Sequence, residues 1–316
     1  MARVNDEALI KQYVLHCKRQ GKTKKCIENY VGAVNIFHQF LQQKQLTFLA
    51  VDGMKNKDIL ESFLDYLRDE RKVSFARIKV YFSALSHFYD YLEYNEYIEK
   101  NIVLTVRKMY VRQFKNGYVP AKRKIIEIDE MAHFVNSIMN LRDKTIVTLF
   151  VKTGIRRGEL ISIDVDDVDF KENTIQLKPI FKKRSNLTVF FDEETAVILK
   201  QWLKRRKQIV NAGENALFIS DFGNRLKQRG VYDAVTKWAE FNGFHNPESD
   251  KLKDHFSPHN LRHCFTTYLR RAGVPKSYVQ ELRGDKRGDV IDIYHHIDEM
   301  DLKKAYLAAI PKLNLI

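Results

Sequence analysis

Residues 257–273 read SPHNLRHCFTTYLRRAG, and this stretch predicts an amphipathic helix that begins at Pro258 and is closed by a glycine. His259, Arg262 and His263 are spaced i, i+3 and i+4, so their side chains share one face. A neighbouring face is apolar and carries Leu261, Phe265, Tyr268 and Leu269. Hydrogen-bond donors without acceptors on a half-buried helix indicate an anion site, whereas the alternative is an ordinary surface or core histidine–arginine pair.

A second cationic stretch is TGIRRGELISI, residues 153–163. Gly154 is expected to end a buried helix, and Arg156 and Arg157 stand at the turn into the next one. An arginine at a helix entrance adds a bidentate fork to free backbone N–H groups, and both suit phosphate. Glu159 can orient one of these arginines. The alternative is that both arginines are simply solvated.

Two more stretches carry polar groups of interest. TIQLKPIFKKRSNLTVFFD, residues 174–192, predicts two short strands around a basic tip, where Lys182 and Lys183 can reach over a phosphate. GDVIDIYHHI, residues 288–297, places Tyr294 32 residues after Arg262. Taken alone, a charged hairpin tip is usually solvated and such a tyrosine is usually a core aromatic.

The charge of the chain favours a polyanionic partner. Among 316 residues, 54 Lys and Arg outnumber 40 Asp and Glu, which gives a net charge of +14. The excess is clustered in five runs along the chain, as a long duplex contact requires. These runs are residues 18–25, 107–115, 121–124, 181–184 and 203–207. The candidate DNA-binding residues are Lys22, Lys24, Lys25, Arg107, Lys108, Arg112, Lys122, Arg123 and Lys183.

Composition also excludes several classes of protein. No run of 18 apolar residues occurs and the N-terminus lacks a signal-peptide pattern, so we expect a cytoplasmic protein with no membrane partner. Cys17, Cys26 and Cys264 are too few and too irregularly spaced for a disulfide framework or a zinc site. We therefore expect reduced thiols and no metal.

Apolar periodicity divides the chain. Residues 1–106 predict four helices in a small bundle, with Thr23 and Ser74 as two of the caps. Residues 107–124 lose the periodicity and read as a basic interdomain linker. Residues 125–316 are mixed, so the fold class is mainly α with a small antiparallel β-sheet.

Several elements are expected in the second part. Asp129 is predicted to cap a helix through Met139, residues 143–153 to form a buried helix, and Asp192 to cap another. A short strand is expected at residues 217–219. The tail carries a short apolar helix that either docks on an adjacent protomer or packs on its own domain.

Taken in order, the pattern R…K…HxxRH…Y resembles the tyrosine recombinases, the phage integrase and Xer family, over nearly the whole chain. The resemblance implies an N-terminal four-helix core-binding (SAM-like) DNA-binding domain at 1–106 and an α+β tyrosine recombinase catalytic domain at 125–316. The residues that match the family's catalytic positions are Arg156, Lys182, His259, Arg262 and Tyr294. Lys183 and, more distantly, Lys178 are alternatives for the hairpin lysine.

Three supporting positions follow from the same resemblance. Glu159 matches the acidic residue that supports the first arginine, and His263 occupies a position that is often basic. Asp285 departs from the pattern, because the family usually has histidine or tryptophan nine residues before the nucleophile. A carboxylate beside a scissile phosphate is repulsive unless a cation intervenes. Either Asp285 accepts a hydrogen bond from a neighbour, or Lys286 or Arg287 supplies the missing donor.

The resemblance implies a site-specific recombinase that cleaves and rejoins DNA through a 3′-phosphotyrosine, without a cofactor. Its partner is double-stranded DNA with a specific recombination site, bound as a homotetramer on synapsed DNA by a protein that is monomeric in free solution. The integrase of a mobile element is preferred, with a Xer-like resolver of chromosome or plasmid dimers as the alternative. A type IB topoisomerase and a non-catalytic DNA-binding regulator are the rival classes.

Overall fold

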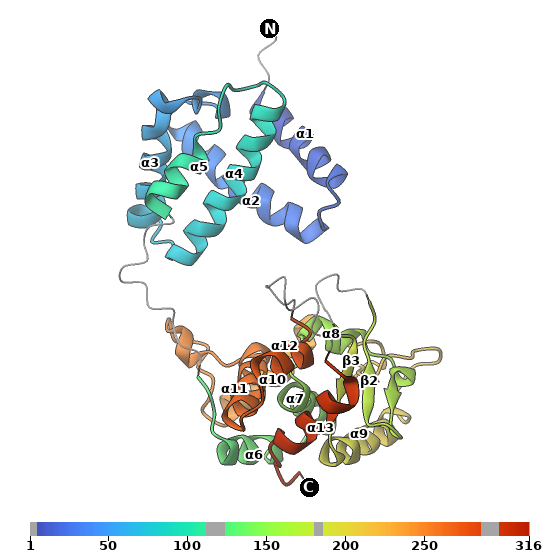
Figure 1. Cartoon of the computed structure of the whole chain (residues 1–316). Coiled ribbons are helices and arrows are strands. Elements are labelled where there is room, and N and C mark those ends of the chain that lie inside the picture. The colour runs from blue at the N-terminus through green and yellow to red at the C-terminus, as the bar shows by residue number, and fades with distance from the viewer. Residues whose placement is uncertain (1–4, 112–123, 180–185, 286–296, 316) are drawn as a thin grey trace. The chain divides into compact units, whose positions relative to one another are not determined.

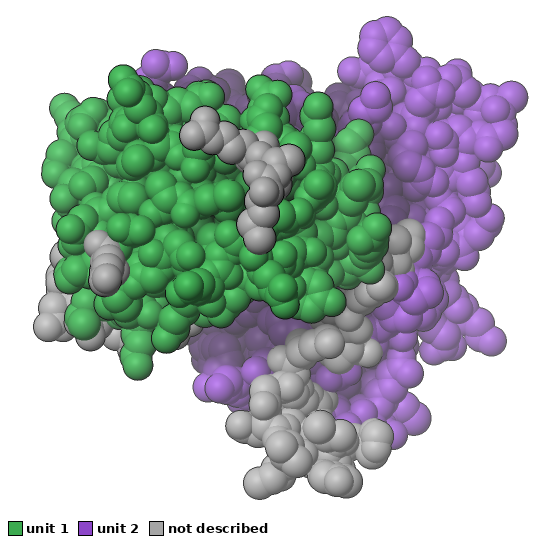
Figure 2. All heavy atoms as spheres, turned by 90° about the horizontal axis from the view of Figure 1, so that it is seen from above, with its two compact units in different colours: residues 1–120 green, residues 121–316 purple. Residues whose placement is uncertain are grey.

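A computed structural model describes residues 5–111, 124–179, 186–285 and 297–315 (Figure 1). The chain divides into two compact units, residues 1–120 and residues 121–316 (Figure 2). Each unit encloses its own hydrophobic core. Within the described ranges, no helix is both long enough and apolar enough to cross a membrane.

The first unit contains the four predicted helices. They are α1 (Asp6–Arg19), α2 (Lys24–Gln43), α3 (Lys57–Asp65) and α4 (Phe75–Tyr94). Short 3-10 turns lie at Phe48–Ala50 and Met54–Asn56, and a π-helical turn, Tyr66–Glu70, extends α3. Helix α2 packs along α4 (Figure 1). The Thr23 side chain caps α2 by accepting from the backbone N–H of Cys26 at 3.3 Å, whereas Ser74 precedes α4 without a side-chain cap bond.

A short fifth helix was not predicted. Helix α5 (Val103–Val106) continues into a π-helical turn, Arg107–Val111. Asn101 Oδ1 accepts from the backbone N–H of Val103 at 2.9 Å, and the three valines Val103, Val106 and Val111 are buried in the unit's core. Periodicity could not reveal this helix because its apolar stretch is only about one turn long.

The second unit is built around one buried helix. Helix α7 (Leu141–Thr153) packs against α6 (Ile128–Asn136), α9 (Glu193–Arg206), α10 (Gln228–Phe241) and α11 (Pro258–Arg271) (Figure 1). Every residue of α7 from Asp143 to Thr153 is buried. The remaining helices are α8 (Arg157–Ser162), α12 (Lys276–Arg283) and α13 (Glu299–Ala309), with 3-10 turns at Val165–Asp167 and Leu252–Asp254.

A small sheet completes this unit. Strands β1 (Val168–Asp169), β2 (Thr174–Gln176) and β3 (Thr188–Phe190) are antiparallel in the order β1-β2-β3. Ile175 in the middle strand is paired with Val168 on one side and Val189 on the other. The predicted fold class, mainly α with a small antiparallel sheet, is confirmed.

Three local predictions need correction. Glu127, not Asp129, caps α6, because Glu127 and Glu130 form a reciprocal capping box, and the helix ends at Asn136. Residues 217–219 do not form a strand; the bridges there are isolated, at Ala216 and Ile219. Strand β1 was missed because two residues give no period. The predicted Asp192 cap is confirmed, since its side chain accepts from the backbone N–H of Thr195 at 3.0 Å.

The C-terminal tail packs on its own unit. Leu302 and Tyr306 of α13 are buried in a cluster with residues of β3, α11 and α12. Tyr306 donates to the backbone carbonyl of Lys152 at 2.9 Å. Of the two predicted alternatives for the tail, the structure therefore has docking on its own domain.

Candidate active site

The turn after α7 brings two distant arginines together. Gly154 ends α7 in the left-handed conformation, with φ at 61°. Its carbonyl accepts a hydrogen bond from Arg262 Nη1, which lies 108 residues further along the chain. Because Arg156 follows Gly154 by two residues, the same turn carries it to α11. The two arginines that the motifs predicted to act together thus lie beside one another.

Arg156 is held by a buried carboxylate. It is the N-cap residue of α8, and its backbone N–H donates to Glu159 Oε2 at 2.7 Å while its Nη1 donates to Glu159 Oε1 at 2.9 Å. Glu159 is completely buried, whereas 39% of the Arg156 side chain is exposed. Glu159 therefore holds the backbone N–H and the Nη1 group of Arg156 and leaves its Nη2 group for another acceptor.

Arg262 lies much deeper than Arg156. Only 4% of its side chain is exposed, and its Nη2 donates to the backbone carbonyl of Arg283 at 3.0 Å. Burial lowers the pKa of the Arg262 guanidinium, and the positive charges of Arg156 and Arg283 lower it further. The carboxylates of Asp285 and Glu159 act in the opposite direction and favour the charged form.

One carboxylate joins the arginines. Asp285 Oδ1 accepts from Arg156 Nη2 at 2.6 Å and from Arg262 Nη2 at 2.9 Å, while Asp285 Oδ2 lies 3.1 Å from Arg283 Nε. Asp285 therefore accepts hydrogen bonds from its neighbours, as one of the two explanations expected; the other, a donor supplied by Lys286 or Arg287, is not tested. Lys286 and Arg287 lie outside the described residues.

A pocket of about 620 Å³ opens beside Arg156, Arg262 and Arg283. It is lined by the first residues of α8, α10 and α11 and by the end of α12. Its basic lining residues are Arg156, Arg157, His259, Arg262 and Arg283. Such a concentration of donors beside an open cavity suits a phosphate group.

Sequence reasoning missed three lining residues: Gln228, Tyr232 and Arg283. Gln228 accepts from Arg157 Nη2 at 3.2 Å, so it positions the second arginine of the first motif. The basic run around Arg283 was visible in the sequence. Gln228 and Tyr232 carried no signal, because only the packing of α10 brings them to the pocket.

The two histidines of α11 differ in exposure. His259 is exposed and lines the pocket, while His263 is half-buried. Their rings meet edge to face, with centroids 4.5 Å apart. The ring of His263, one helical turn after His259, therefore supports the His259 ring beside the pocket.

Several predicted residues lie outside the described parts of the chain. They are Tyr294, Lys182 and Lys183 among the catalytic and hairpin residues, and Arg112, Lys122 and Arg123 among the DNA contacts. In the first unit, Lys24, Lys25 and Lys108 are exposed, and Lys22 and Arg107 are half-buried. Lys22 lies 5.5 Å from the centre of the Tyr30 ring.

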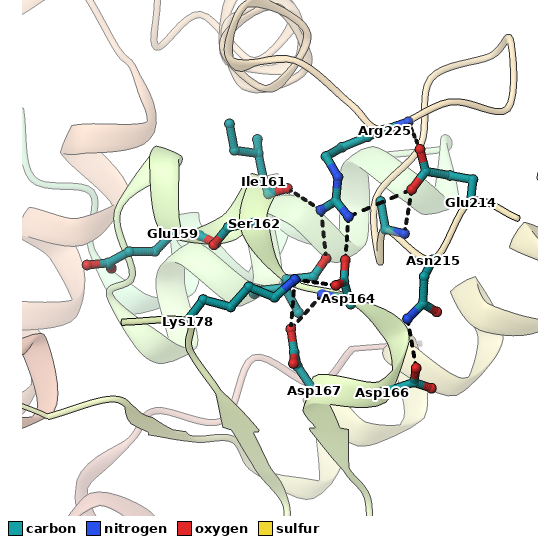
Figure 3. A network of polar contacts seen from close by, with 12 residues as sticks. Glu159, Ile161, Ser162, Asp164, Asp166, Asp167, Lys178, Glu214, Asn215 and Arg225 are labelled. Atoms are coloured by element: carbon teal, nitrogen blue, oxygen red, sulfur yellow. Dashed lines mark hydrogen bonds and ion pairs between the residues drawn. The ribbon is translucent and has the colours of Figure 1, made fainter. Parts of the chain in front are cut away.

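Lys178, the third candidate for the hairpin lysine, is engaged elsewhere (Figure 3). Its ammonium contacts Asp164 and lies 4.0 Å from Asp167. Asp164 also accepts from Arg225, which donates to the backbone carbonyl of Ile161 at 2.9 Å. This network ties the end of α8 to the strand side of the hairpin.

Metal binding has no support in the described parts of the chain, where no three His, Cys, Asp or Glu residues are grouped to hold an ion. The three cysteines are unpaired thiols, and Cys17 and Cys264 are buried. Neither observation adds a group to the pocket.

Sequence similarity covers both units. Residues 124–300 match the profile of the phage integrase family, and residues 9–99 match the phage integrase N-terminal SAM-like domain. The chain is 32% identical over 193 residues to tyrosine recombinase XerC of Vibrio cholerae serotype O1, which covers 60% of this chain and 59% of the relative. It is 26% identical over 315 residues to XerC of Thermodesulfovibrio yellowstonii, which covers 96% of each protein.

Solved structures share the fold. XerH site-specific recombinase bound to difH substrate has a TM-score of 0.65 at 22% identity, covering 96% of this chain and 84% of that one. The Tn1549 transposon integrase in complex with circular intermediate DNA has a TM-score of 0.66 at 18% identity, covering 95% and 98%. At such identities the likeness concerns the fold.

Proposed function

Because the chain belongs to the phage integrase family of tyrosine recombinases, as its motifs predicted, we propose that it is a site-specific DNA recombinase. It cleaves and rejoins DNA strands through a 3′-phosphotyrosine intermediate. The observation that carries the proposal is the meeting of Arg156 and Arg262 on a single anionic oxygen, at 2.6 and 2.9 Å. A nonbridging phosphate oxygen accepts hydrogen bonds from arginine at the same distances.

The chemistry needs fixed cations. Attack on a phosphodiester adds negative charge to a phosphorus already surrounded by anionic oxygens, and Arg156 and Arg262 meet that charge. Their planar forks suit two nonbridging oxygens, and His259 donates a further hydrogen bond. Glu159 and the carbonyl of Gly154 hold the two arginine side chains in place before substrate arrives.

Tyr294 is the proposed nucleophile and Lys182 the proposed general acid. The Tyr294 phenol loses its proton to solvent water and its oxygen forms a bond to phosphorus as the bond to the 5′-oxygen breaks, while Lys182 gives a proton to that departing oxygen. The phosphotyrosine bond retains the energy of the broken linkage, so the 5′-hydroxyl of another strand can reverse the step. No cofactor is required in this scheme.

The proposed partner is double-stranded DNA carrying a specific recombination site. The net charge of +14 supports a polyanionic partner, as do the exposed Lys24, Lys25 and Lys108 of the first unit. Residues 1–106 would act as the core-binding domain and the basic stretch 107–124, which begins with the π-helical turn Arg107–Val111 of the first unit, would contact the duplex. Exchange between two duplexes calls for four protomers, assembled on synapsed DNA from monomers.

The biological role has two candidates. The sequence favoured the integrase of a mobile element. The match to XerC over 315 residues and 96% of both proteins supports the second candidate, a Xer-like resolver of chromosome or plasmid dimers. Mapping the cleaved sites distinguishes them, because a resolver acts at its own chromosomal or plasmid site and an integrase at the ends of its element.

A covalent trap tests the activity itself. The protein is incubated with genomic DNA fragments that carry nicks near potential cleavage sites, so that a cut releases a short 5′ strand and prevents rejoining. We expect a protein–DNA adduct with the wild type and with Tyr94→Phe, whose side chain is 79% exposed in the first unit. Tyr294→Phe should give none. Binding without any adduct from the wild type would instead support a DNA-binding regulator.

A further inference from the structure

We propose that Asp285 is an internal occupant of the phosphate site, which the scissile phosphate must displace before Arg156 and Arg262 can act. The inference rests on the proposed recombinase function and concerns how the same pocket is filled when DNA is absent. It explains why an acidic residue is tolerated in contact with three arginines, Arg156, Arg262 and Arg283.

The first observation is that both hydrogen atoms of Arg262 Nη2 already have acceptors. This nitrogen has two of them, and it donates to the Arg283 carbonyl at 3.0 Å and to Asp285 Oδ1 at 2.9 Å. Both donors of Nη2 are therefore in use. A phosphate oxygen can take a direct hydrogen bond from this nitrogen only if Asp285 or the carbonyl releases it.

The same carboxylate oxygen engages the second arginine. Asp285 Oδ1 lies 2.6 Å from Arg156 Nη2, and Arg156 Nη1 is bound to Glu159. The edge of Arg156 that faces Arg262 is thus directed at an anionic oxygen in the absence of DNA. Asp285 Oδ1 stands where a nonbridging phosphate oxygen would accept from both guanidinium groups.

Charge balance gives this contact its energetic reason. Arg156, Arg262 and Arg283 gather around the pocket, and Arg262 is nearly fully buried. Asp285 contacts all three, at 2.6, 2.9 and 3.1 Å. Without DNA, Asp285 therefore adds to Glu159 in offsetting their mutual repulsion, and a dianionic or monoanionic phosphate can take over the role of Asp285.

The exposure of Asp285 fits an occupant that can leave. Its side chain is 27% exposed, whereas the supporting Glu159 is completely buried. Asp285 also directly follows Gly284, which ends α12 in the left-handed conformation with φ at 62°. Glu159 is enclosed within the fold, whereas Asp285 is partly exposed and follows the last turn of α12.

Inorganic phosphate is the probe that tests the proposal, because its binding requires no strand cleavage. Thermal unfolding is followed as phosphate replaces chloride at constant ionic strength, for the wild type, Asp285→Asn and the control Asp250→Asn. Asp250 is exposed and outside the pocket. We expect Asp285→Asn to reach half-saturation at a phosphate concentration about tenfold lower than the wild type. Asp250→Asn should match the wild type.

Two further variants make the result specific. Adding Arg156→Gln to Asp285→Asn should abolish the gain, which places the phosphate at the arginine pair. Asp285→His, which removes the negative charge and adds a donor, should also lower the midpoint and serves if Asp285→Asn does not fold. Equal phosphate midpoints for the wild type and both Asp285 variants would overturn the proposal. Loss of phosphate binding in the two variants would overturn it as well, because Asp285 would then be needed to position the arginines for phosphate.

The covalent trap separates this inference from the proposed function. Adduct formation by the wild type with unchanged phosphate midpoints would refute the displacement of Asp285 and leave the recombinase intact. If Asp285→Asn binds phosphate at a lower concentration than the wild type, but the wild type forms no covalent adduct with DNA, Asp285 occupies an anion site and the strand-cleavage chemistry is refuted.

Discussion

Gly154 lies directly against the ring of Phe265: a Cβ atom added to Gly154 would be 2.3 Å from Phe265 Cδ1. The glycine also has a φ of 61°, which favours a residue without a Cβ. Two independent constraints therefore fix the turn that places Arg156 beside Arg262. The position of the arginine pair depends on the packing of α7 against α11.

Gly154→Ala should accordingly destabilise the second unit. The left-handed conformation costs about 1–2 kcal/mol for a residue with a Cβ, and the overlap with Phe265 adds about 1–3 kcal/mol. Gly243→Ala is the matched control, since its φ is 71° but nothing lies within 4 Å of the added Cβ. Urea unfolding should give a clearly larger loss for Gly154→Ala. Equal losses would mean that the Phe265 contact relaxes without cost.

Replacing either arginine by lysine should slow strand cleavage by on the order of a hundredfold or more, because a lysine lacks the planar fork. The two variants should differ in stability. Arg156→Lys affects a side chain that is 39% exposed, whereas Arg262→Lys leaves buried acceptors at Gly154 and Arg283 without their donors. Adduct formation rates and urea unfolding of both variants check this. Equal stability would contradict the structural part of the argument.

The helix faces and the cationic motifs were predictable from the sequence, because a local period fixes which side chains share a face. The spacing of His259 and Arg262 needed no tertiary information. The contact of Asp285 with Arg156 spans 129 residues and depends on turns at Gly154 and Gly284, so the sequence left its role open. The prediction that Asp129 caps α6 was wrong, because the reciprocal capping box of Glu127 and Glu130 satisfies two backbone N–H groups and a single cap at Asp129 would satisfy one.

Acidification should destabilise the first unit through His87. Burial lowers the pKa of His87, and the charges of Lys22 and His16 lower it further. Its Nδ1 lies 2.7 Å from the Tyr13 hydroxyl and its Nε2 lies 2.9 Å from Gln20 Oε1. A neutral ring with its proton on Nε2 satisfies both partners, accepting from the Tyr13 hydroxyl and donating to Gln20; protonating Nδ1 places a charge in this half-buried site and forces the Tyr13 hydroxyl to turn and accept instead.

The sign follows from the lowered pKa of His87. In the unfolded chain, His87 takes up a proton near the ordinary histidine pKa of about 6.5, whereas in the folded unit it does so only at lower pH. The contribution of His87 to the stability of the unit is therefore complete above pH 6.5 and falls as the pH drops below that value. Hydrogen exchange in α1 and α4, corrected for intrinsic rates, should report a smaller opening free energy at pH 5.5 than at pH 7.5. His87→Gln should reduce this difference. An unchanged pH dependence in the variant would assign it to His16 or another group.

Asp164 should be a stabilising residue of the second unit. It accepts from both Lys178 and Arg225, so Asp164→Asn removes the charge that both cations face. We expect a loss of about 1–3 kcal/mol in the free energy of unfolding. Asp166→Asn is the control. Within this network, Asp166 accepts one exposed hydrogen bond, from the side-chain amide of Asn215 at 2.7 Å (Figure 3). Similar losses in the two variants would show that the network adds little.

The buried ammonium of Lys152 should hold the C-terminal tail in place. Lys152 Nζ is fully buried and donates to Asp192 at 2.5 Å, to Glu194 at 2.6 Å and to the carbonyl of Pro311 at 2.7 Å. Glu194 in turn accepts from the backbone N–H groups of Leu313 and Asn314 at 2.9 and 2.7 Å. Lys152, the two carboxylates and the tail therefore form one hydrogen-bonded network. Removing Lys152 leaves the negative charges of Asp192 and Glu194 without a cation.

Lys152→Met keeps the bulk of the side chain but leaves Asp192 and Glu194 without their cation, so unfolding should become easier by about 3–5 kcal/mol. Adding Glu194→Gln removes one unpaired charge while its amide oxygen can still accept from the tail, so the double variant should recover part of the loss. Urea unfolding of the wild type, both single variants and the double variant gives the coupling between the two sites. Strictly additive losses would contradict the charge-pair argument, because the cost of Lys152→Met would then arise from packing alone.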